Sequence, residues 1–130
     1  MKNTIMQKIL LIAFLGLFSQ FSAAQDAATV AAAKQVADIV ANLNHFPSDA
    51  DKATLSEISG NSALPQRLRD MATAVSNIQH AATAEDKATM AEIQASDSAP
   101  DAAKALAGII ASINHVASPD AKAELAQLFP

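Results

Sequence analysis

Three histidines recur at a fixed interval and are the side chains best suited to chemistry in this chain. His45, His80 and His115 are 35 residues apart, in the segments Leu43-Asn44-His45, Ile78-Gln79-His80 and Ile113-Asn114-His115. Histidine is the commonest metal ligand among protein side chains. The recurrence therefore raises the hypothesis of a site for a metal ion, zinc or copper, at these three residues, with a haem site or a pH sensor as alternatives.

A structural role explains the same three histidines. A histidine near a helix C-terminus interacts favourably with the helix dipole, and it can bond the last carbonyls of the helix. Asn44 and Asn114 beside two of them also suit helix ends. Duplication of a helical unit copies its end along with the rest, so recurrence alone does not favour a metal. The helix-end role is the preferred interpretation.

The expected spacing of the histidines also speaks against a shared metal ion. Equivalent positions on stacked helices lie about 8–10 Å apart, whereas a zinc–nitrogen bond is about 2.0–2.1 Å long. Three histidines in a ladder would not converge on one ion unless the stack curled sharply. Acidic residues near the same turns would be needed to complete a site: Asp49, Asp51, Glu85, Asp86 and Asp120.

Composition argues against most enzyme classes and against nucleic-acid binding. The 130 residues include three glycines and no cysteine, and the formal net charge is −4. Thiol chemistry is excluded, phosphate-binding glycine loops are not expected, and an acidic chain is a poor partner for nucleic acid. With no Gly-x-Ser-x-Gly turn either, the sequence predicts a protein that is not an enzyme and has no catalytic residues or cofactor beyond that metal hypothesis.

The N-terminus has the pattern of a secretory signal peptide. Lys2 and Lys8 precede an apolar run at 9–18, and Ser22-Ala23-Ala24 supplies the small residues of a cleavage site. A membrane anchor is the alternative, but a spanning helix needs about 20 apolar residues. We expect residues 1–24 to be the signal peptide and residues 25–130 the exported chain, periplasmic or extracellular. That chain would carry seven basic and 13 acidic residues.

Apolar residues at helical spacing predict three long helices, one before each histidine. Ala37, Ala72 and Ala107 share one position on these helices, which suggests a close approach of two helices there. An apolar stripe is formed in each helix by residues at i, i+4 and i+7: Val36, Val40 and Leu43; Met71, Val75 and Ile78; Leu106, Ile110 and Ile113. No period-2 alternation indicates a strand.

A shorter helix is expected after each histidine, beginning near 49, 84 and 119. Ser48 and Thr83 each stand three residues before an aspartate, and Ser118 directly precedes Pro119. Each of these patterns is typical of the start of a helix. We also expect Ser98 to cap the helix after Pro100, and Gly60 to end the second helix in a left-handed conformation.

Together these signals predict an all-α fold of three tandem 35-residue helical hairpins, about six helices, stacked as a short α-solenoid or bundle. The units would span about 30–64, 65–99 and 100–130 of one domain, 25–130. Unit length and the spacing of Ala53 to Pro65 and of Ala88 to Pro100 resemble those of tetratricopeptide repeats. The family's aromatic positions are absent, so the resemblance concerns geometry only.

Helical-hairpin stacks usually present a concave surface to proteins or peptides. The sequence therefore favours an exported, non-enzymatic interaction module with an unidentified protein or peptide partner, and self-association through uncapped ends. Its groove would use variable positions on the long helices: Asp38, Asn42, Thr73, Asn77 and Ser112. The alternative is a periplasmic metal- or small-ligand-binding protein that uses the histidines, and a structural or stress protein of the envelope is a third reading.

Overall fold

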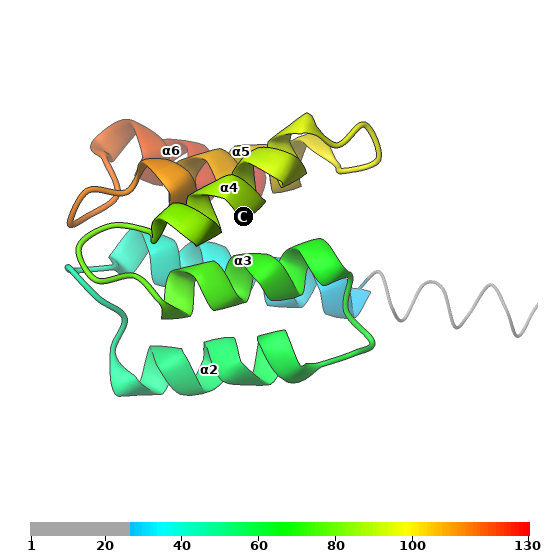
Figure 1. The fold of residues 1–130 in the computed structure, drawn as a ribbon, viewed down its shortest axis with the longest axis horizontal. Coiled ribbons are helices and arrows are strands. Elements are labelled where there is room, and N and C mark those ends of the chain that lie inside the picture. Colours follow the sequence, from blue (N-terminus) through cyan, green and yellow to red (C-terminus); the bar gives the residue numbers. More distant parts are fainter. Residues whose placement is uncertain (1–26) are drawn as a thin grey trace, which may run out of the picture.

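The computed structural model describes residues 27–130 and is all-helical, with six helices (Figure 1). The residues expected to form the signal peptide, 1–24, lie outside the described part. The first helix covers residues 27–42 of that part and is followed by five more: α2 (Asp49–Gly60), α3 (Gln66–Ser76), α4 (Ala84–Ala95), α5 (Asp101–Ser112) and α6 (Pro119–Leu128).

The three short helices, α2, α4 and α6, begin where the sequence predicts. The hydroxyl of Ser48 accepts a hydrogen bond from the backbone N–H of Asp51, and Thr83 and Ser118 do the same for their helices. Each bond satisfies one of the N–H groups that a helix start leaves without an intrahelical partner. The prediction of these helix starts is confirmed.

The predicted apolar stripes form the core. All nine predicted stripe residues are buried, although the last of each stripe lies just after its helix, and Ala37, Ala72 and Ala107 are buried too. The short helices add Leu55 and Ile58, Met90 and Ile93, and Leu125. Burial of these side chains against one another drives the association of helices that are too short to be stable alone in water.

Helices that follow one another in the chain associate as antiparallel neighbours around this core. α2 packs against α3 and α4 against α5, while α3 also contacts both α4 and α5 (Figure 1). The three long helices thereby lie together, and the turns that follow them come to one end of the molecule. This arrangement positions the histidines.

Two of the predicted helix-end signals are wrong. Gly60 is the last residue of α2 and, like every described glycine, lacks a positive φ. Ser98 does not cap α5, whose N-cap is Pro100 without a side-chain bond; the Ser98 hydroxyl instead lies 3.0 Å from that of Ser96. The left-handed conformation expected of a glycine occurs at the three histidines.

Residues 27–130 contain no β-strand, only three isolated bridges within the histidine turns. Across the same residues, the longest apolar helical stretches fall short of what is needed to cross a membrane.

Candidate metal centre

The three histidines lie in the turns that follow the three long helices. The first helix ends at residue 42, α3 at Ser76 and α5 at Ser112, and a histidine follows within three or four residues. A buried residue stands two positions before each one: Leu43, Ile78 and Ile113. These apolar side chains anchor the turns to the core, so the histidines are held at the end of the helix bundle.

Each histidine has a backbone conformation that is uncommon for its residue type. The φ angles are 69° for His45, 73° for His80 and 70° for His115, and no other described residue has a positive φ. The Phe46 N–H donates to the Asn44 carbonyl at 2.8 Å, and Val116 bonds Asn114 in the same way. These are γ-turns of the positive-φ type, which are rare and strained. Backbone strain of this kind tends to occur at functional sites.

A closed ring of backbone hydrogen bonds joins the three turns. The His45 N–H donates to the His115 carbonyl at 2.7 Å, the His80 N–H to the His45 carbonyl at 2.6 Å, and the His115 N–H to the His80 carbonyl at 2.6 Å. Every histidine thus uses both its N–H and its C=O within the ring. The ring fixes the three Cα positions relative to one another and holds the strained turns in place.

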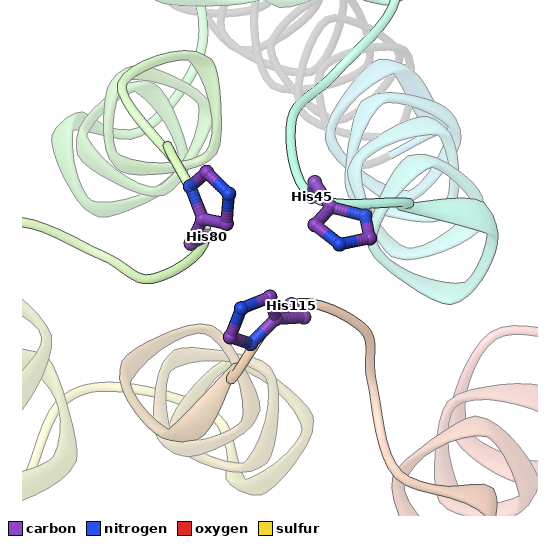
Figure 2. Close-up of side chains that lie close together, drawn as sticks. All are labelled: His45, His80 and His115. Carbon is purple, nitrogen blue, oxygen red and sulfur yellow. The ribbon is translucent and has the colours of Figure 1, made fainter.

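The imidazoles consequently face one another around a common centre (Figure 2). Their centroids are 5.0–5.3 Å apart and their planes are 81–90° to one another. One ring nitrogen from each histidine lies within 4.8 Å of the other two. The imidazoles are therefore closer together than the expected 8–10 Å, because backbone hydrogen bonds join the three histidine turns directly.

These distances are close to those of a metal site. A point equidistant from three atoms spaced by 4.8 Å lies about 2.8 Å from each, which is roughly 0.7 Å longer than a zinc–nitrogen bond. An ion at this point would therefore need each nitrogen to lie about 0.7 Å closer to it.

Two asparagines orient the rings. The Asn44 side-chain oxygen lies 2.6 Å from Nδ1 of His45, and Asn114 makes the same contact with His115. When Nδ1 donates its proton to this amide oxygen, Nε2 keeps its lone pair for a ligand. From the sequence, these asparagines were expected at helix ends, and their contact with the histidine rings was missed. Their position directly before two of the histidines is the signal that could have revealed it.

The electrostatic setting favours a cation. Three helices direct their C-termini, the negative ends of their dipoles, toward the turns that hold the rings. The group of candidate ligands consists of the three histidines and includes no carboxylate from the described residues. The acidic residues expected to complete the site therefore do not join it; Asp86, for example, accepts hydrogen bonds from Asn77 and Thr83.

The cluster is open to solvent on its outer side. His45 is partly exposed, and His80 and His115 are exposed. Phe46 and Val116, which follow two of the histidines, are 59% and 43% exposed and are two of three large apolar side chains exposed in the described part. The cluster thus combines three solvent-exposed or partly exposed rings with exposed apolar residues next to two of them in the chain.

The positions expected to line a groove are all exposed but engage in local contacts. The Asp38 carboxylate pairs with Lys34 at 3.2 Å, and Asn42 donates to the Asp38 carbonyl. The hydroxyls of Thr73 and Ser112 donate to carbonyls of their own helices. Three lysines that recur every 35 residues on the short helices are also exposed: Lys52, Lys87 and Lys122.

Comparison with known proteins gives no relative: no family model, curated protein or solved structure matches the chain.

Proposed function

We propose that this protein binds one transition-metal ion, Zn²⁺ or Cu²⁺, through His45, His80 and His115. The observation that carries the proposal is the convergence of one ring nitrogen from each histidine to within 4.8 Å, on strained turns locked by a ring of backbone bonds. A helix-end role would not require the three rings to meet. In an exported chain, as the N-terminus predicts, the protein would serve as a metal carrier or buffer rather than an enzyme.

The ligand set indicates the metal class. Neutral imidazoles suit zinc, copper, nickel and iron, whereas calcium and magnesium prefer oxygen ligands. Copper(II) gains most from nitrogen ligands in the general affinity order, and three histidines with a free fourth position are also a known zinc arrangement. The site would take either metal, and exchange would be easy because its outer face is exposed.

The same ring supports a proposal about the fold. We propose that the three helical hairpins are copies of one unit related by an approximate threefold rotation about an axis through the histidines. The short helices begin 35 residues apart, and the turns share φ angles of 69–73°. In this arrangement the units form a closed bundle. An open solenoid, by contrast, would leave the first and third histidines apart.

The proposal is tested by titrating the purified, untagged chain with zinc and with copper in a calorimeter. We expect one ion per chain, and loss of binding by about 100-fold or more when any one histidine becomes alanine. Lowering the pH from 7 to 5 should weaken binding, because protons compete with the metal for the same nitrogens. Absence of saturable binding, or binding that survives all three single substitutions, would contradict the proposal.

Asn44 and Gln79 provide a matched pair for this titration. Both precede a histidine, but the 2.6 Å contact with a ring nitrogen is made by Asn44. Asn44→Ala should weaken metal binding about 10-fold, the lower end of the usual effect of an orienting partner. Gln79→Ala should leave the affinity unchanged.

A second candidate, the protein or peptide interaction module expected from the sequence, is supported by the exposure of Phe46 and Val116 beside the histidines. Exposed apolar side chains that gather in one place often mark an interaction surface. Self-association through this face would appear in light scattering as a dimer that Phe46→Ser dissociates. A chain that stays monomeric at high concentration, with and without metal, would rule out that form of the candidate.

A further inference from the structure

The three histidine turns share one backbone conformation but differ in the residue before the histidine. That residue is Asn44 before the first histidine, Gln79 before the second and Asn114 before the third. The φ angles of the histidines lie between 69° and 73°. Since the backbones agree this closely, the difference between the turns lies in the side chains.

The His80 ring lacks the orienting contact that the other two rings have. Nδ1 of His45 and Nδ1 of His115 each lie 2.6 Å from the side-chain oxygen of the preceding asparagine, whereas no residue from 27 to 130 makes a hydrogen bond to the His80 ring. Gln79 has one methylene more than asparagine, so its amide oxygen is not placed against the ring of the following residue.

The His80 ring can also leave the cluster without a change in the backbone. The His80 N–H donates to the His45 carbonyl, and the His80 carbonyl accepts from the His115 N–H, both at 2.6 Å. The turn therefore stays fixed when the side chain rotates. His45 is partly exposed, and His115 is exposed but restrained by Asn114. His80 is exposed and has no such restraint.

This asymmetry affects the strength of the three ligands. A hydrogen bond to the second nitrogen of a ligating imidazole fixes the ring orientation and makes the ligand more basic, and its loss lowers metal affinity by about 10–100-fold. His45 and His115 have an amide oxygen in this position. Of three metal–nitrogen bonds at this site, the bond to His80 would be the weakest.

On the basis of the proposed metal site, we infer that His80 is its exchangeable ligand, and that the ion enters and leaves through replacement of His80. The incoming group is a neutral imidazole, which matches the ligand that it replaces. Its lone pair forms a bond to the ion while the bond from the ion to the His80 nitrogen breaks. His45 and His115 hold the ion during this exchange. No proton or electron is transferred, and the charge of the complex is unchanged.

Titration of the zinc-loaded, ¹⁵N-labelled chain with imidazole tests this inference. We expect the ring signals of His80 to return to their metal-free positions while those of His45 and His115 remain shifted. The inference is overturned if all three return at the same imidazole concentration, or if His45 or His115 returns first. A chain that binds no zinc in the calorimeter would overturn the metal site as well, so the two failures are distinguishable.

Substitutions at the residue before the histidine provide matched variants. Gln79→Asn supplies the asparagine of the other two turns and should slow zinc transfer to a colorimetric chelator, at a fixed imidazole concentration, about tenfold. Gln79→Ala removes no ring contact and should leave the rate unchanged. The reverse substitution, Asn44→Gln, should make His45 exchange as readily as His80. Circular dichroism would show that each variant remains helical. Equal transfer rates for Gln79→Asn and the unaltered chain would overturn the inference.

Discussion

At the scale of the residue, the positive φ of the three histidines separates the preference of the backbone from the role of the side chain. The left-handed region raises the conformational energy of a residue with a Cβ by roughly 1–2 kcal/mol, whereas glycine adopts it with almost no steric penalty. Glycine would therefore be the most stable choice at each turn. The chain has histidine at all three, the residue that the proposed metal site requires.

This contrast predicts the outcome of two substitutions at His80. Both His80→Gly and His80→Ala remove the imidazole, but only alanine keeps a Cβ at a φ of 73°. Without metal, the glycine variant should be more stable than the alanine variant by about 1 kcal/mol, as measured by urea unfolding. Neither should bind metal at the affinity of the unaltered chain. Equal stability of the two would mean that the turn is not strained.

At the scale of the element, the short helices are fixed by local signals, and the long helices mainly by burial. Ser48, Thr83 and Ser118 each cap a short helix, whereas Pro65 and Pro100 begin α3 and α5 without a side-chain cap. The long helices instead bury stripes of large apolar residues. Their packing can accept small changes where a neighbour is flexible.

Gly108, inside α5, is such a place. A Cβ there would lie 2.6 Å from Nε2 of Gln94 on α4, and Gln94 is exposed, so its amide can turn outward into solvent. Since glycine lowers helix stability by about 0.8–1.0 kcal/mol relative to alanine, Gly108→Ala should stabilise the chain by roughly 0.5–1 kcal/mol. A rise in the thermal midpoint would show this; a fall would mean that the Gln94 side chain is held in place.

At the scale of the whole molecule, the helices and the core residues were predictable, and the meeting of the histidines was not. Apolar spacing predicts which side chains are buried, such as Val36 and Ile110, because burial follows helical period. The closure of the ring depends on the backbone of the turns, where sequence signals for a positive φ are glycine or asparagine. With histidine in that position, the sequence pointed to a helix end, and the separation of the rings was overestimated.

The most direct test of the central claim is nitrogen NMR of the imidazoles during a zinc titration. The chain has three histidines, so an untagged, ¹⁵N-labelled sample gives one set of ring signals per ligand. We predict that one ring nitrogen of each of His45, His80 and His115 shifts together with the others, and that all three saturate at one zinc ion per chain. Rings that keep their metal-free signals at one equivalent, or that respond one at a time at different zinc concentrations, would contradict a shared three-histidine site.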